Sequence, residues 1–308
     1  MDLLNHLPEL LQVLFLAVLQ GVTELFPVSS LGQSIIIPGL FGWGNLLTSE
    51  TFVPILVMLH LGTATALLTF FWRDWVELIT AFFKTAFAGR LDAHPQGKTI
   101  WLLIVGTIPV GLAGLLLNGP IKAIFFSSQW PVIPAAFLCL NGAILFVGEQ
   151  LRQRSEPDVH DRYKQEQAFK RIPQLTFLQA TLIGAAQTFA LIPGISRSGI
   201  SMVAGMGARL SHAEAARFSF LLATPVILLA GLLEVPKLFD APTSTLVIAI
   251  IGAIVSGIAA FLSVRFLTAY FEVGRLTPFA IFCLVEGLIA FLIFAPISLG
   301  VFSLPWVH

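Results

Sequence analysis

The segment QGVTELFPVSSLGQS, residues 20–34, decides the fold because it breaks an apolar region with polar and helix-breaking residues. On its N-terminal side runs LLQVLFLAVL (10–19), and on its C-terminal side runs IIIPGLFGW (35–43). Both runs are apolar enough for the interior of a membrane, yet a carboxylate, Glu24, and a proline, Pro27, stand between them. The pattern predicts two apolar helices that are joined by a polar turn at membrane depth.

The composition of the whole chain indicates an integral membrane protein. Of its 308 residues, 56% are hydrophobic and 11% are charged, whereas a soluble domain carries about 25% charged residues. The long apolar runs lack the alternating pattern of a membrane barrel, so the predicted fold class is all-α. Seventeen basic residues balance 17 acidic ones, and no nucleic-acid partner is expected.

Six apolar runs are long enough, or nearly so, to cross a bilayer about 30 Å thick at about 20 residues each. They cover residues 52–71, 100–117, 131–148, 217–235, 244–267 and 278–295. Two more apolar regions, 10–40 and 175–205, are broken in the middle by proline, glycine and serine. These two regions are predicted to be re-entrant helix pairs, so the chain is expected to be a polytopic membrane protein.

Short matches between the two halves of the chain indicate an internal repeat. The matching pairs are GTIPVG (106–111) with GAIVSG (252–257), FLCLNG (137–142) with FCLVEG (282–287), and QGVTELFPVSSLG (20–32) with QTFALIPGISRSG (187–199). Residues 1–150 and 175–308 are therefore predicted to form two inverted repeats, joined by a linker at 151–174, each with one re-entrant pair and three spans. Sites in such folds lie near the midplane, where the repeats meet. Chance similarity between glycine-rich apolar segments is the alternative.

Basic residues orient the predicted spans. The connecting loops 72–98 and 149–174 are rich in lysine and arginine. The positive-inside rule therefore places both loops in the cytoplasm. If both broken regions are re-entrant, the two termini both fall outside.

The first broken region holds polar residues in a pattern typical of a site. Ionisable groups and irregular backbone at membrane depth are costly and usually functional. Gln20 and Glu24 are four residues apart and so share one helix face. Ser29 and Ser30 follow Pro27 and can cap the next helix.

The second broken region contains LIPGISRSGIS (191–201), which favours anion binding. Arg197 carries a planar fork suited to phosphate, and the loop glycines let backbone N–H groups converge ahead of a helix N-terminus. The neighbours expected to complete the phosphate cradle are Ser29, Ser196, Ser198, Gly199 and Ser201. A buried ion pair of Glu24 with Arg197, which only ties the two regions together, is the alternative. The residues themselves predict a membrane site for an anionic, phosphorylated ligand.

The two polar segments resemble the signature motifs of a known family. QGVTELFPVSSLG (20–32) and PGISRSGIS (193–201) are similar to those of undecaprenyl-diphosphate phosphatases, bacterial membrane enzymes that recycle the lipid carrier of cell-wall synthesis. FWRDW (71–75) and FSFLLATP (218–225) are similar as well, so the resemblance covers essentially the whole chain. It implies hydrolysis of undecaprenyl diphosphate to undecaprenyl phosphate and inorganic phosphate in a bacterial plasma membrane.

The resemblance also implies roles for single residues. Arg197 would hold the diphosphate, and Glu24, with Gln20 one turn earlier, would aid metal binding or proton transfer. Ser30 would lie close to the phosphate as a candidate nucleophile. Family members use a divalent cation, Mg²⁺ or Ca²⁺, for which Glu24 is the candidate ligand. The expected partners are a polyprenyl diphosphate, membrane lipids and, as a further candidate, a second copy of the chain in a homodimer.

Gln33 departs from the family pattern, in which a histidine follows Ser-Ser-x-Gly and serves as nucleophile or acid/base. A glutamine can hydrogen-bond to phosphate but cannot supply a proton at neutral pH. Three interpretations stay open. Ser30 activated by Glu24 carries the chemistry while Gln33 orients the substrate, or His60 in LHLGT takes the place of the missing histidine, or the chain binds the lipid without hydrolysing it.

A protein of another class, a flippase or transporter for the phosphorylated carrier, is the alternative function. Inverted repeats with polar loops near the midplane are typical of transporters. A flippase needs no phosphate release, so an assay of phosphate release distinguishes the two functions.

Overall fold

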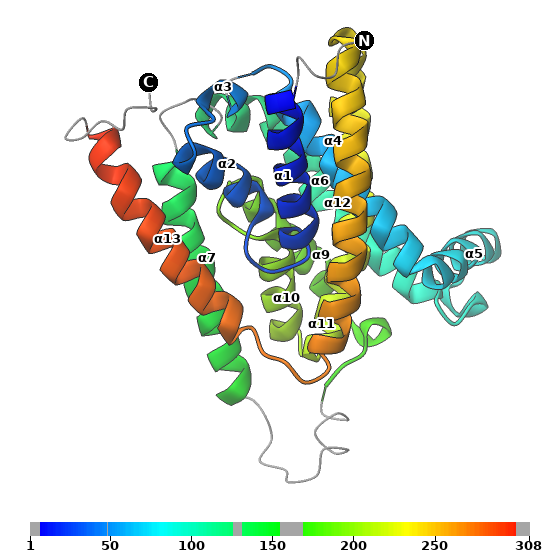
Figure 1. The fold of residues 1–308 in the computed structure, drawn as a ribbon. Coiled ribbons are helices and arrows are strands. Elements are labelled where there is room, and N and C mark those ends of the chain that lie inside the picture. Colours follow the sequence, from blue (N-terminus) through cyan, green and yellow to red (C-terminus); the bar gives the residue numbers. More distant parts are fainter. Residues whose placement is uncertain (1–6, 48, 126–130, 155–168, 300–308) are drawn as a thin grey trace.

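The computed structural model describes residues 7–47, 49–125, 131–154 and 169–299, and helices dominate these ranges (Figure 1). No strand occurs in them, and their one strand-like pairing is an isolated parallel bridge between Lys170 and Leu210. The prediction of an all-α fold is confirmed.

Six helices in these ranges are long and apolar enough to cross a membrane. They are α4 (Phe52–Phe70), α6 (Gly97–Phe125), α7 (Val132–Arg154), α11 (His212–Glu234), α12 (Thr243–Tyr270) and α13 (Thr277–Ser298). Each lies over one of the six apolar runs in the sequence, which confirms a polytopic membrane protein. Several helices continue into polar sequence, because helical hydrogen bonds do not end where the apolar residues end.

The two broken regions form pairs of shorter helices. The first contains α1 (Leu7–Thr23) and α2 (Ser30–Leu40). The second contains α9 (Phe177–Gln187) and α10 (Arg197–Gly207), with the 3-10 helix η4 (Thr188–Leu191) between them. In Figure 1, α1 and α2 lie towards one end of the bundle and α9 and α10 towards the other. The long helices around both pairs enclose the polar turns.

The connection 72–98, expected as a loop, is largely helical. It contains α5 (Trp72–Ala88) and the 3-10 helix η2 (Leu91–Ala93), and α5 leaves the bundle sideways in Figure 1. The exposed apolar residues of α5 recur at helical spacing, which explains why this segment forms a helix: Trp72, Val76, Ile79, Phe83 and Phe87. Three short elements complete the described chain: α3 (Gly44–Leu47), η3 (Ile172–Gln174) and η5 (Val235–Asp240).

An ion pair and a histidine–carboxylate contact bring the two basic connections to one end of the bundle. Asp74 at the start of α5 pairs with Arg217 in the second turn of α11. At the start of the same helix, His212 Nε2 lies 2.7 Å from Glu149 Oε2 near the end of α7. The start of α5 and the end of α7 therefore share one end of the molecule.

The helices of the two predicted repeats pack in matched pairs. The re-entrant helix α1 packs on α12, and its counterpart α9 packs on α6. Likewise α4 packs on α12, and α11 packs on α6. Two related halves would give this arrangement, although the inverted repeat itself stays a prediction. Residues 155–168 of the predicted linker, and residues 1–6 and 300–308 at the termini, lie outside the described residues.

Candidate active site

The turn between α1 and α2 is fixed by Ser29, which joins this helix pair to the pair formed by α9 and α10. Its backbone has φ 62°, a left-handed conformation that is uncommon for a residue other than glycine. Its Oγ accepts hydrogen bonds from Gly32 N at 3.2 Å and from Gly194 N at 3.1 Å, and donates to Ile195 O at 3.3 Å. Ser29 thus caps α2 and joins the first polar turn to the second.

The second polar turn is held by Ser196 and by Asn141 of α7. Ser196 caps α10, because its Oγ accepts from Gly199 N at 3.1 Å. Asn141 Oδ1 accepts from Ser196 N, and Asn141 Nδ2 donates to Pro27 O, both at 3.0 Å. One amide on a spanning helix therefore fixes both turns, and Arg197 follows at the first position of α10.

Glu24 is the centre of the site, because its carboxylate receives contacts from both broken regions and from α4. Oε1 accepts from Arg197 Nη2 at 2.9 Å and from Arg197 Nε at 3.2 Å. Oε2 accepts from Ser30 Oγ at 2.5 Å and from Gln20 Nε2 at 3.0 Å. The predicted residues Gln20, Glu24, Ser30 and Arg197 are thus in direct contact.

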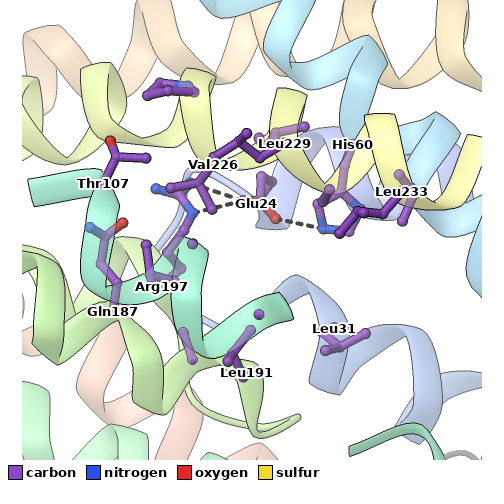
Figure 2. Close-up of a pocket in the computed structure, with 18 of the residues that line it drawn as sticks. Glu24, Leu31, His60, Thr107, Gln187, Leu191, Arg197, Val226, Leu229 and Leu233 are labelled. Carbon is purple, nitrogen blue, oxygen red and sulfur yellow. Dashed lines mark hydrogen bonds and ion pairs between the residues drawn. The ribbon is translucent and has the colours of Figure 1, made fainter. Parts of the chain in front are cut away.

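His60 of α4 joins this cluster. Its Nε2 lies 3.2 Å from Glu24 Oε2, and its Nδ1 lies 2.7 Å from Leu56 O (Figure 2). A carbonyl oxygen can only accept, so Nδ1 carries a hydrogen. Nε2 can then donate to the carboxylate only when the ring is protonated on both nitrogens. His60 is therefore placed to hold a transferable proton beside Glu24.

Gln33 lies apart from this cluster. Its Nε2 donates to Glu286 Oε2 of α13 at 2.6 Å, and its side chain is buried. Gln33 does not line the cavity that contains Glu24, whereas His60 does. The structure thus brings His60, and not Gln33, to the carboxylate.

The residues predicted for a phosphate cradle divide into two groups. Ser29, Ser30, Ser196 and Arg197 line the cavity. Ser198 Oγ instead donates to Phe26 O at 3.0 Å, and Ser201 Oγ donates to Arg197 O at 2.7 Å. Ser198, Gly199 and Ser201 do not line the cavity, and their contacts hold α10 in place behind Arg197.

The cavity around this cluster has a volume of about 820 Å³ and extends between α4, α6 and α11. Beyond the polar cluster its wall is mostly apolar, with Val53 and Val57 on α4, Leu112 on α6, and Leu229 and Leu233 on α11, and Glu234 lies at the end of α11. A charged end that continues into an apolar channel suits an amphipathic molecule with an anionic head and a hydrocarbon tail.

Comparison with known proteins gives the family. The chain matches the bacitracin resistance protein BacA family over residues 13–289. It belongs to this family. It is similar to an undecaprenyl-diphosphatase of Mycolicibacterium paratuberculosis (strain ATCC BAA-968 / K-10), with 47% identity over 285 residues that cover 87% of this chain and 92% of the relative. It is also similar to undecaprenyl-diphosphatase 1 of Burkholderia pseudomallei (strain 1106a), with 48% identity over 277 residues that cover 90% and 94% of the two chains.

Two polar residues of this BacA-family site escaped the sequence reasoning. Asn141 lies in the apolar run FLCLNG, where a buried amide in a predicted span was the available signal. Gln187 lines the cavity, and in the sequence its one signal is its alignment with Gln20 in the predicted repeat. Neither precedes a glycine-rich turn directly, so motif spacing does not reveal them.

The described residues of the BacA-family chain do not build a metal site by themselves. No group of three histidine, cysteine, aspartate or glutamate side chains in these ranges could hold a metal ion. Both oxygens of Glu24 already accept hydrogen bonds, and one of them is engaged by Arg197. A divalent cation at Glu24 would need most of its oxygen ligands from a bound phosphate or from water.

Proposed function

We propose that this chain hydrolyses undecaprenyl diphosphate to undecaprenyl phosphate and inorganic phosphate in the plasma membrane of a bacterium. The observation that carries this proposal is the cluster of Glu24, Ser30, His60 and Arg197 in a cavity whose remainder is mostly apolar. The names of the similar relatives, undecaprenyl-diphosphatases, support it.

Arg197 binds the diphosphate and stabilises the charge that develops as the bridging bond breaks. Its guanidinium is held by Glu24 and by the backbone carbonyl of Ser219, to which Nη1 donates at 3.2 Å. Phosphoryl transfer depends mainly on such positioning and electrostatic stabilisation. When the diphosphate binds, its oxygens compete with Glu24 for Arg197 and leave the carboxylate free to accept a proton.

Ser30 is the nucleophile of the proposed reaction, and Glu24 is its base. Ser30 Oγ already donates to Glu24 Oε2, the contact that proton transfer requires. As Oγ bonds to the terminal phosphorus, the bond from that phosphorus to the bridging oxygen breaks and undecaprenyl phosphate leaves. Water then attacks the phosphoserine, inorganic phosphate leaves, and a proton returns to Ser30.

His60 supplies the proton that Gln33 cannot supply. Its Nε2 faces the same carboxylate oxygen as Ser30, so it can donate to the departing bridging oxygen and restore its proton later through Glu24. The geometry favours the second of the three interpretations, in which His60 replaces the family histidine. Gln33 donates a hydrogen bond to Glu286 and takes no direct part in the proposed reaction.

The apolar part of the cavity receives the prenyl tail. On α6 the lining runs from Ile100 to Leu115, and the part of it around Leu112 and Leu115 meets the late turns of α11 and the first turns of α4. These turns are remote from the basic connections, so the positive-inside rule places them in the outer half of the membrane. The substrate therefore enters from the outer leaflet, while the segments 72–98 and 149–174 face the cytoplasm and both termini lie outside.

A divalent cation, Mg²⁺ or Ca²⁺, is proposed as a cofactor on the strength of the family resemblance alone. Glu24 would be its ligand from the protein, and the cation would supply positive charge to the phosphate oxygens. Addition of a chelator to the hydrolysis assay, followed by each cation, tests this proposal. Assembly as a homodimer is likewise a proposal, which the mass of the protein in detergent tests.

The test of the proposed function is release of inorganic phosphate from undecaprenyl diphosphate by the purified protein in detergent. Arg197→Ala should lower kcat/KM by about a hundredfold or more, because a preorganised charge at the reacting group is lost. Arg90→Ala, which removes an exposed arginine outside the cavity, serves as the matched control and should leave turnover unchanged.

Near-normal phosphate release by Arg197→Ala would overturn the assignment of this site. A wild-type protein that binds the lipid, moves it between leaflets of a vesicle and releases no phosphate would instead support the flippase alternative.

A further inference from the structure

Gln187, the last residue of α9, lies in the wall of the cavity with no partner for its side-chain amide. It is fully buried, and neither its Nε2 nor its Oε1 has a hydrogen-bond partner. In the part of the chain that the structure describes, no other residue has two side-chain polar atoms that are both buried and unpaired. Burial without a hydrogen bond is unfavourable, so such a group usually has an external partner.

The counterpart of Gln187 in the first repeat shows which kind of partner is missing. Gln20 aligns with Gln187 in the sequence parallel, and Gln20 Nε2 donates to Glu24 Oε2 four residues later. Four residues after Gln187 stands Leu191, which cannot accept a hydrogen bond. Gln187 therefore has no carboxylate at the position that Glu24 occupies relative to Gln20.

The surroundings of Gln187 favour an anion from outside the chain. Figure 2 shows Gln187 and Thr107 on one side of Arg197, with Glu24 and His60 on the other side, and all five residues line the same cavity. Thr107 Oγ1 already donates to Leu103 O at 2.8 Å, so its hydrogen is not available. Gln187 Nε2 is thus a free donor beside the cationic Arg197.

We propose that Gln187 binds a phosphate group of the substrate by donating from Nε2 to a phosphate oxygen, on the side of Arg197 that faces away from His60. This inference rests on the proposed function and extends it, because a diphosphate is long enough to contact both sides of the arginine. Oε1 is left to accept from water or from a protonated phosphate oxygen.

The test is Gln187→Met, which keeps the length of the side chain and removes both polar atoms. If Gln187 binds phosphate, kcat/KM falls about tenfold or more, mainly through a higher KM, and inorganic phosphate inhibits the variant more weakly. The thermal midpoint of the unliganded protein should stay equal or rise, because an unpaired buried amide has gone. Thr224→Val is the matched control, since Thr224 Oγ1 is also buried and unpaired but does not line the cavity.

Wild-type kinetics and wild-type phosphate inhibition in Gln187→Met would overturn the proposal. Thermal shift with inorganic diphosphate provides a readout that does not need turnover: the ligand should raise the midpoint of the wild type more than that of the variant, and equal shifts would also overturn it. If the wild type released no phosphate, the proposed function would fail, while this thermal shift would still decide whether Gln187 binds the anion.

Discussion

At the scale of single residues, Glu24 sets the charge of the site. It accepts from Arg197 through one oxygen and faces Ser30, Gln20 and His60 through the other. With His60 protonated, one negative and two positive charges share the cluster. This excess of positive charge in a buried cavity attracts a diphosphate. The diphosphate then binds Arg197 in place of Glu24.

Substitutions at His60 and at Gln33 should have different effects on the rate of phosphate release. His60→Ala should lower kcat of phosphate release by about a hundredfold or more, because general acid–base catalysis of this kind contributes about 10²–10⁴-fold. Gln33→His should give no gain, since residue 33 faces Glu286 and not the cavity. Both variants are measured with undecaprenyl diphosphate at saturating concentration.

A large gain in Gln33→His together with full activity in His60→Ala would show that His60 has not replaced the family histidine. His60→Gln is a useful companion, because it keeps a hydrogen bond to the carboxylate while removing the titrating ring. Loss of activity in this variant as well would assign the effect to proton transfer rather than to packing.

Much of the residue pattern at the site could be predicted from sequence, because its residues lie in two short motifs. Glu24, Ser30 and Arg197 stood out as polar groups in apolar surroundings, and the structure brings them together. A catalytic role for His60 was one of three alternatives from the sequence. Residue spacing does not show which face of α4 packs against the polar turn between α1 and α2. The orientation of Ser198 and Ser201 away from the cavity likewise depends on tertiary hydrogen bonds, from Ser198 to the Phe26 carbonyl and between the hydroxyls of Ser201 and Ser219.

At the scale of helices, close backbone contacts between small residues hold the re-entrant pairs in place. A Cβ atom built on Gly184 of α9 would lie 2.0 Å from Gly106 O of α6, and one built on Gly21 of α1 would lie 2.3 Å from Ser256 O of α12. Membrane helices pack closely through such positions. These contacts fix α9 and α1, whose last turns carry Gln187 and Gln20.

Gly184→Val should therefore destabilise the protein and weaken its activity. The added side chain cannot fit against the α6 backbone, so α9 has to move, and overpacking of this kind costs about 1–3 kcal/mol. The expected result is a lower thermal midpoint in detergent and a raised KM, because Gln187 moves with the helix. Gly207→Ala is the control, since a Cβ there meets no atom within 4 Å.

An unchanged midpoint in Gly184→Val would mean that the contact between α9 and α6 is looser than the structure describes. The positions of the six spans were predictable at this scale because each helix is mostly apolar, whereas their ends extend into polar sequence. The helix α5 was not predictable in this way, because its apolar residues form one stripe along a segment that also carries many polar and charged residues.

At the scale of the whole molecule, the cavity connects the polar turns to the surface that faces lipid. Its apolar lining includes Leu112, Leu115 and Leu232, which are exposed at the surface of the bundle. Leu232 lies in the last turn of α11, and Leu112 and Leu115 lie in the second half of α6, away from the basic connections. A lipid tail can therefore remain among the acyl chains of one leaflet while its head group reaches Arg197.

The orientation of the molecule decides which leaflet this is, and single cysteines can determine it. Both native cysteines are first replaced, by Cys139→Ser and Cys283→Ser. In this background, Glu50→Cys places an exposed thiol just before the start of α4, and Arg90→Cys places one just after the end of α5. A membrane-impermeant maleimide should label Glu50→Cys in intact cells, and should label Arg90→Cys only after permeabilisation, because the positive-inside rule predicts that the basic connection faces the cytoplasm. Phosphate release by both variants confirms that each is folded. The reverse labelling pattern would place the apolar end of the cavity in the inner leaflet, and the substrate would then have to be taken from the cytoplasmic side.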